Sequence, residues 1–185
     1  MNLIISLIYA PIVLFSLKYF DIKTASIYIF IFSFFWFLLN MKKGLKEYGF
    51  SILYMIFALV AFFVENSLFL KITPSILAFI VTAFVLYSYL SKSSFVIYYI
   101  EKFKKNLSIE DKIYLQNSTL FWFFVALTNL LLHIFILYYN DIVIWTIYSS
   151  FAWYFVFIFG LIIQIIHKKL FFKKENRSEE RRVGK

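Results

Sequence analysis

Long apolar runs alternate with short polar breaks along this chain. Six runs are bounded by charge, Asn, Gly or Pro, and they cover residues 3–17, 24–40, 48–64, 74–91, 118–138 and 142–166. A helix needs about 20 apolar residues to cross a 30 Å hydrocarbon core, and roughly 17–25 are tolerated. Strands of a membrane barrel are shorter and alternate apolar with polar positions. The pattern therefore predicts an all-α fold, a polytopic transmembrane helix bundle of about five to six membrane helices.

The first run leaves two alternatives open. It is short and contains Pro11, which removes a backbone donor and kinks a helix. If this run spans the membrane, the N-terminus is cytoplasmic. If it only dips into the bilayer, five spans remain and the N-terminus lies outside.

Polar residues at the breaks predict where helices start. Thr73 followed by Pro74 is typical of a cap and a first helical position, so we expect the fourth segment to begin at Pro74. Asp141 is placed to cap the sixth segment. Ser108, with Asp111 three positions later, resembles a capping box for a helix that leads into the fifth segment.

The amino-acid composition indicates that much of the protein's surface faces lipid. Of the 185 residues, 63% are hydrophobic, whereas soluble domains are about 45–50% apolar. A chain of this size cannot bury so many large side chains away from water, so lipid must act as the solvent for much of its surface. The chain has no cysteine, which excludes disulfides, thiol catalysis and cysteine-based metal sites.

The distribution of lysines predicts an orientation. The breaks after the second, fourth and sixth segments hold twelve lysines, whereas the alternate breaks hold only Lys18, Lys23 and Lys71. The positive-inside rule places the lysine-rich side in the cytoplasm. We therefore expect a multi-pass protein of the bacterial inner (plasma) membrane with its Lys-rich loops and C-terminus cytoplasmic. The twelve are Lys42, Lys43, Lys46, Lys92, Lys102, Lys104, Lys105, Lys112, Lys168, Lys169, Lys173 and Lys174.

The long lysine-rich break, residues 92–117, has a helical pattern of its own. Its apolar residues fall at helical spacing beside several of these lysines. The spacing predicts an amphipathic helix on the cytoplasmic interface, with lysines near anionic headgroups; the alternative is a solvated charged linker. The apolar residues are Val96, Tyr99, Ile100, Phe103 and Leu107.

The end of the chain differs in character from the rest. Residues 177–185 read RSEERRVGK and contain all three arginines of the chain. The same string results when a common sequencing adapter is translated, so we expect it to be foreign. The native protein is then a single transmembrane helical domain over residues 1–176. Removing the tail's four basic and two acidic residues changes the formal charge from +9 to +7.

Few polar side chains fall inside the predicted segments. Asn129 and His133 lie four residues apart and share a helical face, and Gln164 lies in the sixth segment. One interpretation is a polar path through a small transporter or channel component, with His133 as a proton carrier. The other is that these side chains hydrogen-bond between helices and fix the bundle. No Asp or Glu lies in mid-membrane, which favours the second interpretation.

Signatures of enzymes are missing from the sequence. The chain has two histidines, with no carboxylate at ligand spacing from either, so we expect no metal site. It has no phosphate-binding glycine loop and no G-x-S-x-G elbow. We therefore expect no catalytic residues and no cofactor. We also expect no nucleic-acid partner, because the membrane topology accounts for the positions of the lysines. A lipid-modifying enzyme would need acidic residues such as Asp21, Glu65 and Asp141 to cluster at one interface.

One stretch resembles a known family. Residues 69–77, FLKITPSIL, resemble the F-I-K-x-K-P-T-[IV]-[IL] signature of the intracellular septation protein A family, the YciB-like inner-membrane proteins. Phe69, Lys71 and Pro74 match in register, whereas Thr73 replaces the family's second lysine. The departure at Thr73 weakens the match at one position of the motif.

Three other stretches agree more loosely with the same family. Asp21 lies in a match to its opening pattern, Trp122 in a match to its L-A-W-x-x-F-F pattern, and Trp145 in a match to its W-x-x-F-K-x-F-G element. The stretches follow the family's order over nearly the whole chain. The resemblance implies a non-enzymatic protein that supports septation and envelope maintenance through contacts with the lipid bilayer and with inner-membrane division or envelope-synthesis proteins.

Overall fold

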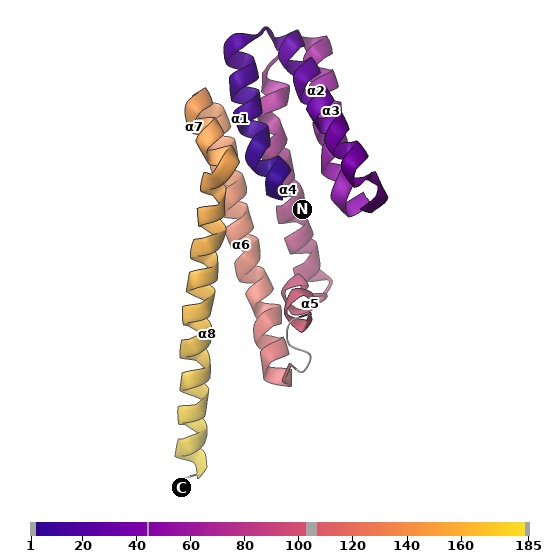
Figure 1. Ribbon diagram of the computed structural model, residues 1–185. Helices are drawn as coiled ribbons and strands as arrows, with labels where there is room; N and C mark the ends of the chain where they lie inside the picture. The colour runs from indigo at the N-terminus through magenta and orange to yellow at the C-terminus, as the bar shows by residue number, and fades with distance from the viewer. Residues whose placement is uncertain (1–2, 44, 103–106, 184–185) are drawn as a thin grey trace. The chain divides into compact units, whose positions relative to one another are not determined.

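The chain folds as helices joined by short connections. A computed structural model describes residues 3–43, 45–102 and 107–183, and these ranges contain no strand (Figure 1). The all-α prediction is therefore confirmed. In chain order the elements are α1 (Leu3–Tyr19), α2 (Ile22–Asn40), the 3₁₀ turn η1 (Met41–Lys43), α3 (Leu45–Val64), α4 (Leu68–Leu90), α5 (Phe95–Glu101), α6 (Ile109–Tyr139), α7 (Ile142–Ile147), the π-helical turn η2 (Tyr148–Ala152) and α8 (Trp153–Val183).

Several of these helices have the dimensions of membrane spans. In the part of the chain that the structure describes, four helical stretches are long and apolar enough to cross a membrane. The stretches are Ile22–Asn40, Leu68–Leu90, Asp111–Tyr139 and Ile142–Leu170. Leu7–Tyr19 and Tyr48–Val64 are shorter apolar helices, and they correspond to the first and third predicted segments.

Side-chain caps explain where several helices begin. Asp21 accepts hydrogen bonds from two backbone N–H groups in the first turn of α2, and Asp141 does the same for α7. Ser108 Oγ accepts a hydrogen bond from the backbone N–H of Asp111 at 3.0 Å, at the start of α6. These bonds satisfy donors that a helix leaves unpaired at its N-terminus. The predicted caps at Ser108 and Asp141 are therefore confirmed.

The predicted start of the fourth segment at Pro74 is wrong. α4 begins at Leu68, where Asn66 Oδ1 accepts a hydrogen bond from the Leu68 backbone N–H at 2.8 Å. Pro74 therefore lies inside α4, almost two turns from its start. The sixth segment also differs from prediction, because η2 interrupts it between α7 and α8.

Part of the lysine-rich break forms a helix, as its spacing predicts. α5 begins after Ser94, whose side chain caps it. Val96 is buried against α6, whereas Tyr99 is exposed, so the predicted apolar face is divided between these two environments. Phe103 lies outside the described residues. The placement of this helix on a membrane surface stays a prediction.

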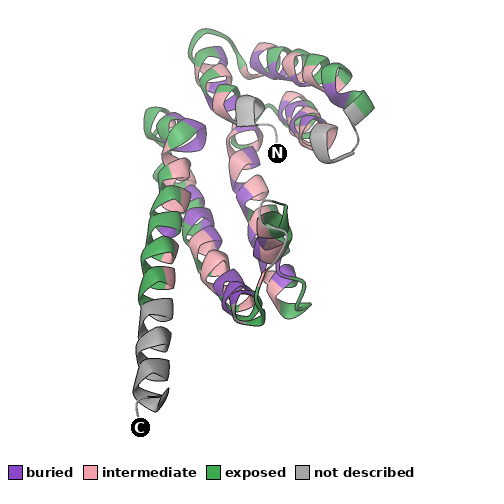
Figure 2. Cartoon of the chain, turned by 60° about the horizontal axis from the view of Figure 1, so that its bottom comes forward, coloured by how far each residue is buried: buried purple, intermediate pink, exposed green. Residues whose placement is uncertain are grey.

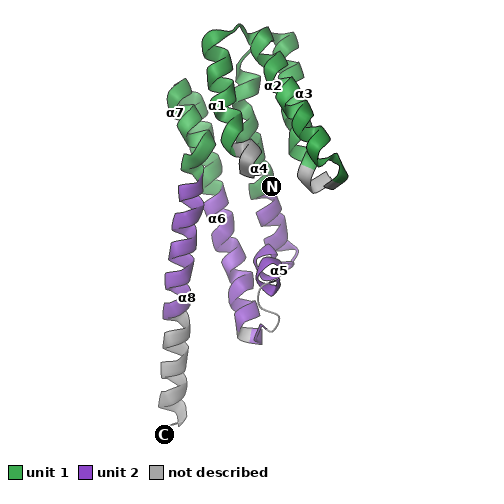
Figure 3. Cartoon of the chain, viewed as in Figure 1, with its two compact units in different colours: residues 1–82, 127–153 green, residues 83–126, 154–185 purple. Residues whose placement is uncertain are grey.

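Contacts within the chain define two compact units (Figure 3). Unit 1 comprises residues 1–82 and 127–153, and unit 2 comprises residues 83–126 and 154–185. Unit 1 takes α1 to α3, the first part of α4, the last part of α6, α7 and η2. Both units draw on α4 and α6, so neither is one continuous stretch of sequence.

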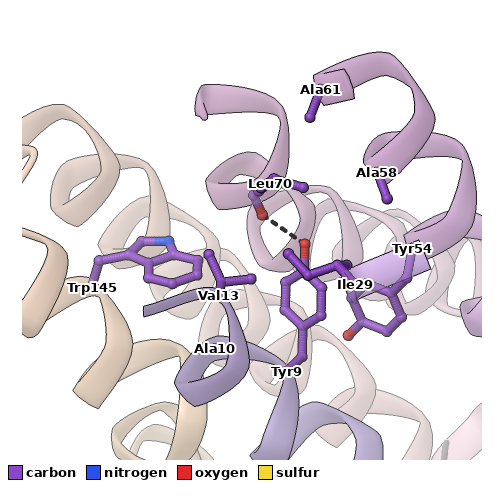
Figure 4. Close-up of a cluster of buried hydrophobic side chains, with 9 residues drawn as sticks. All are labelled: Tyr9, Ala10, Val13, Ile29, Tyr54, Ala58, Ala61, Leu70 and Trp145. Carbon is purple, nitrogen blue, oxygen red and sulfur yellow. Dashed lines mark hydrogen bonds between the residues drawn. The ribbon is translucent and has the colours of Figure 1, made fainter. Parts of the chain in front are cut away.

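Small residues let α2 and α3 pack closely in unit 1. Ala25, Ser26 and Ser33 are buried on α2, and Ala58 and Ala61 are buried on α3. The two helices run side by side in Figure 1. Small side chains permit the close backbone approach that drives helix association in lipid. Larger core residues, drawn in Figure 4, join α1, α4 and α7 to this pair; they are Tyr9, Val13, Ile29, Tyr54, Leu70 and Trp145.

A glycine permits a similar approach in unit 2. A Cβ added at Gly160 of α8 would lie 3.0 and 3.1 Å from the two Cγ atoms of Val125 in α6. Trp122 of α6 stacks on Phe157 of α8, with ring centroids 6.3 Å apart. α6 and α8 therefore pack closely in unit 2, and α5 packs beside α6.

Large apolar side chains are exposed along the helices. Figure 2 shows exposed residues along α8, and α3, α4 and α6 expose Phe63, Leu90 and Tyr138. Exposed apolar surface on this scale is unfavourable in water and is the normal condition of a helix that faces lipid. Together with the four long apolar helices, this surface indicates a membrane protein.

Candidate functional site around Pro74

Residues of the family-like signature meet in unit 1. Phe69, Lys71 and Pro74 lie in the first two turns of α4, and Trp145 of α7 hydrogen-bonds to the same stretch. Phe69 packs against the buried core of the unit. We call the following six residues the proline cluster: Tyr9, Leu70, Lys71, Thr73, Pro74 and Trp145.

Pro74 opens the hydrogen-bond pattern of α4. Proline has no backbone N–H, so it cannot donate to the carbonyl of Leu70 four positions earlier. The Tyr9 hydroxyl of α1 donates to that carbonyl at 2.8 Å, as Figure 4 shows. The same hydroxyl lies 3.3 Å from Thr73 Oγ1. A tyrosine 61 positions away therefore replaces the donor that proline lacks.

The neighbouring carbonyls are bonded by side chains as well. Trp145 Nε1 donates to the Lys71 carbonyl at 3.0 Å, and Thr73 Oγ1 donates to the Phe69 carbonyl at 3.2 Å. An unpaired backbone group in a hydrocarbon environment costs several kcal/mol. Three successive carbonyls of α4 thus accept hydrogen bonds from side chains, two of them from other helices.

Tyr9 and Trp145 are positioned by tight packing. Tyr9 is 1% exposed and stacks on Tyr54 of α3, with ring centroids 4.2 Å apart. Trp145 is 2% exposed. These contacts join α1, α3 and α7 to the opened turn of α4, so the proline cluster is a junction of four helices.

The acidic residues near this end of unit 1 each have a local role. Asp21 and Asp141 cap α2 and α7, and Glu65 Oε1 forms a salt bridge with Lys23 Nζ at 2.8 Å. In the described ranges, no three His, Asp or Glu side chains gather into a possible metal site. Asp21, Glu65 and Asp141 are thus each bound to a group of their own in unit 1.

The Asp21 carboxylate is stabilised by its capping bonds. Hydrogen bonds from the Thr24 side chain, and then from the Thr24 backbone, lower the pKa of Asp21 below its ordinary value. The side chain is fully exposed, so solvent screens this interaction. Asp21 thus acts as a helix cap, outside the proline cluster.

Asn129 and His133 contact the same residue in unit 1. The Tyr148 hydroxyl donates to Asn129 Oδ1 at 2.9 Å, and the His133 ring meets the Tyr148 ring edge-on at 4.7 Å between centroids. His133 is 5% exposed. The two residues share a helical face, as predicted, and both face the π-helical turn η2.

Gln164 has different partners, in unit 2. Trp122 Nε1 donates to Gln164 Oε1 at 2.6 Å, so the signature tryptophan and the polar candidate form one pair. The Tyr114 hydroxyl lies 3.2 Å from His167 Nδ1 and donates to the Gln164 carbonyl at 3.3 Å. The sequence grouped Gln164 with Asn129 and His133, whereas the bonds that define each pair fall in different units.

Three residues of these sites were not singled out from the sequence. Tyr9 and Tyr148 are aromatic residues within apolar runs, and their hydroxyls donate to the Leu70 carbonyl and to Asn129 Oδ1. Asn140 accepts a hydrogen bond from Lys71. A proline inside an apolar run signals that a carbonyl four positions earlier needs a donor. That signal does not say which aromatic residue of another helix supplies it.

Comparison with known proteins gave no match. No protein-family model, no curated protein and no solved structure matches the chain. The resemblance to the septation protein A family therefore stays a prediction from the residues of the signature.

Proposed function

We propose that this chain is a non-enzymatic protein of the bacterial inner membrane that supports septation and envelope maintenance. It acts through contacts with the bilayer and with division or envelope-synthesis proteins. Its Lys-rich loops and its C-terminus face the cytoplasm. The proposal rests on the family-like signature and on the positive-inside distribution of lysines.

One observation carries the proposal furthest. Phe69, Lys71 and Pro74 belong to one stretch that resembles the septation family's pattern, and Trp145 belongs to another stretch, 74 positions after Lys71. They belong to one junction, in which Trp145 bonds to the Lys71 carbonyl beside Pro74. The bond therefore brings the tryptophan of one matching stretch to the backbone of the other.

The proposed mode of action follows from the surface. Exposed apolar faces of the helices can contact lipid or the helices of partners, because packing between helices in lipid depends on close fit. The proline cluster would hold α1, α3, α4 and α7 in the arrangement that such partners recognise. No step of chemistry is needed.

The rival functions have less support. A transport path needs Asn129, His133 and Gln164 to be available to water, whereas Tyr148 engages Asn129 and Trp122 engages Gln164. These bonds favour a structural role for all three. A lipid-modifying enzyme would need free acidic groups at one interface, whereas Asp21 and Asp141 cap helices and Glu65 pairs with Lys23.

Deletion of the gene in the source bacterium tests the proposal. We expect division defects and reduced tolerance of osmotic and envelope stress, restored by the wild-type gene. Complementation with Trp145→Phe should restore less than Trp36→Phe, because within the described residues Trp36 Nε1 has no hydrogen-bond partner to lose. Membrane levels of each variant must be measured in parallel, so that loss of the protein is separated from loss of its role.

The contradicting result is plain. If the deletion strain divides normally and tolerates both stresses as well as its parent, the septation role is wrong. If Trp145→Phe complements fully at equal membrane level, the junction is not required for the role.

A further inference from the structure

Among the described residues, Lys71 forms no salt bridge with a carboxylate. It lies in the first turn of α4 and is half-buried, and its Nζ donates to Asn140 Oδ1 at 2.6 Å. The salt bridges among the described residues do not include it. A neutral amide is therefore the group that this ammonium contacts.

The other lysines predicted on the same side are engaged differently. Lys23 Nζ pairs with Glu65 at 2.8 Å, and Lys18 Nζ lies 5.5 Å from the centre of the Tyr19 ring. Both kinds of contact compensate part of the positive charge. Lys71 lacks such compensation, so its charge remains available for an anion.

Lys71 and Asn140 together offer several donors. An ammonium has three N–H groups and no acceptor, and one of these bonds to Asn140. Because Asn140 accepts through Oδ1, its Nδ2 keeps two further N–H groups that can donate to an anion beside the Lys71 ammonium. Paired amide and ammonium donors match the oxygens of a phosphate, and hydrogen bonds to a charged group are the stronger kind.

From this geometry we infer that Lys71 and Asn140 form a binding site for a phosphate group, carried by an anionic phospholipid or free in solution. Asp141 is the nearest carboxylate in sequence, but its Oδ1 accepts from the backbone N–H groups of Val143 and Ile144 at 2.8 and 2.9 Å. Its charge is thus directed to the start of α7. The site does not rest on the proposed septation role.

The depth of the site suits a lipid headgroup. Lys71 is one turn from the start of an apolar helix, and Tyr138 and Tyr139, next to Asn140, are exposed. Exposed tyrosines at helix ends are typical of the headgroup level of a bilayer. A phosphate at that level would meet the Lys71 ammonium without leaving the interface.

Native mass spectrometry of the full chain in detergent tests the site. Phosphatidylglycerol, phosphatidylcholine and inorganic phosphate are titrated separately, and bound molecules are counted. Lys71→Gln should lower the apparent affinity for phosphatidylglycerol about tenfold, the effect of losing a charge-assisted bond. Lys23→Gln makes the same change in net charge and should leave the affinity unchanged.

A second variant, Asn140→Gly, tests the site even if Lys71→Gln does not fold. Asn140→Gly removes the amide and keeps the backbone, since Asn140 has φ 60, a value that glycine adopts freely. We expect it to weaken phosphatidylglycerol binding several-fold. Its backbone conformation and the charge of Lys71 are both retained, so its binding reports on the amide.

The outcomes separate the two sources of phosphate. Preference for phosphatidylglycerol, lost in Lys71→Gln and kept in Lys23→Gln, supports the site with lipid as its ligand. The same pattern of variants with inorganic phosphate supports the site with soluble phosphate as its ligand. The proposed site is wrong if wild type and Lys71→Gln bind equally well, or if Lys23→Gln loses as much binding as Lys71→Gln. If Lys71→Gln does not fold, full binding by Asn140→Gly shows that the site is wrong.

Discussion

Unit 1 and unit 2 both bury polar atoms among apolar helices, but they satisfy those atoms differently. In unit 1 the acceptors are two backbone carbonyls of α4, that of Leu70, which Pro74 leaves without its helical donor, and that of Lys71 beside it, and the donors are Tyr9 and Trp145 from other helices. In unit 2, Trp122 of α6 donates instead to a side-chain acceptor, Gln164 Oε1 of α8. The opened turn of α4 thus presents acceptors fixed in the backbone, whereas Gln164 presents an acceptor on a flexible side chain.

The difference decides how each unit responds to substitution. A carbonyl fixed in a helix cannot turn toward another donor, so a lost partner leaves it unsatisfied. The Gln164 amide can rotate about its side-chain torsions and find another donor or the headgroup region. Loss of a single donor should therefore cost more in unit 1 than in unit 2.

The largest effect is expected for Trp145→Phe. It removes the donor to the Lys71 carbonyl and leaves a void at a buried position, so we expect a loss of about 2–4 kcal/mol in the free energy of unfolding. Trp36→Phe is the matched control, because Trp36 has no indole bond to lose among the described residues. Unfolding in mixed micelles measures both variants. Equal losses would show that the indole bond contributes nothing.

Tyr9→Phe isolates one hydroxyl. It leaves the stacking ring in place and removes the donor to Leu70, so we expect a loss of about 1–3 kcal/mol. Tyr138→Phe removes the hydroxyl of a residue that is 89% exposed and should change stability by less than about 0.5 kcal/mol. The same unfolding measurement applies. A Tyr9→Phe variant as stable as Tyr138→Phe would argue against the repair of α4 by α1.

Trp122→Phe makes the equivalent change in unit 2. It removes the bond to Gln164 while Phe keeps much of the stacking on Phe157, so we expect a loss of about 1–2 kcal/mol. The expected order is therefore Trp145→Phe, then Trp122→Phe, then Trp36→Phe. If Trp122→Phe proves as costly as Trp145→Phe, the contrast between the units is wrong.

The smallest effect on stability is expected for Asp21→Asn, and this effect depends on pH. The pKa of Asp21 is lower in the folded protein, so its stabilising contribution is present above the ordinary carboxyl pKa and is lost as pH falls through the folded-state value. Asp21→Asn keeps a capping side chain and removes this titration. The gap in midpoint of thermal unfolding between the two proteins should therefore shrink as pH falls below about 4. A constant gap would contradict the role of the carboxylate charge.

The outline of the fold followed from the sequence because lipid imposes a simple rule. A helix that crosses a bilayer must be long and apolar, so the apolar runs located the helices. The caps at Ser108 and Asp141 were also readable, since each depends on residues a few positions away. Local rules sufficed for these features.

The interior of α4 did not follow from local rules. Thr73 and Pro74 look like a helix start, yet the helix begins at Leu68, and Tyr9 and Trp145 bond to the carbonyls near the proline. Those donors lie more than 60 positions away, and no local pattern links them to Pro74. The signature named Phe69, Lys71, Pro74 and Trp145, whereas Tyr9 and Asn140 emerged only from their positions in space.

A double-mutant cycle between Tyr9 and Pro74 tests the central claim most directly. Pro74→Ala restores a backbone N–H for the Leu70 carbonyl, which makes the Tyr9 hydroxyl dispensable. The account predicts that Tyr9→Phe costs at least about 1 kcal/mol less in the Pro74→Ala background than in the wild-type protein. If the two substitutions add without coupling, the Tyr9 hydroxyl does not replace the donor that Pro74 lacks.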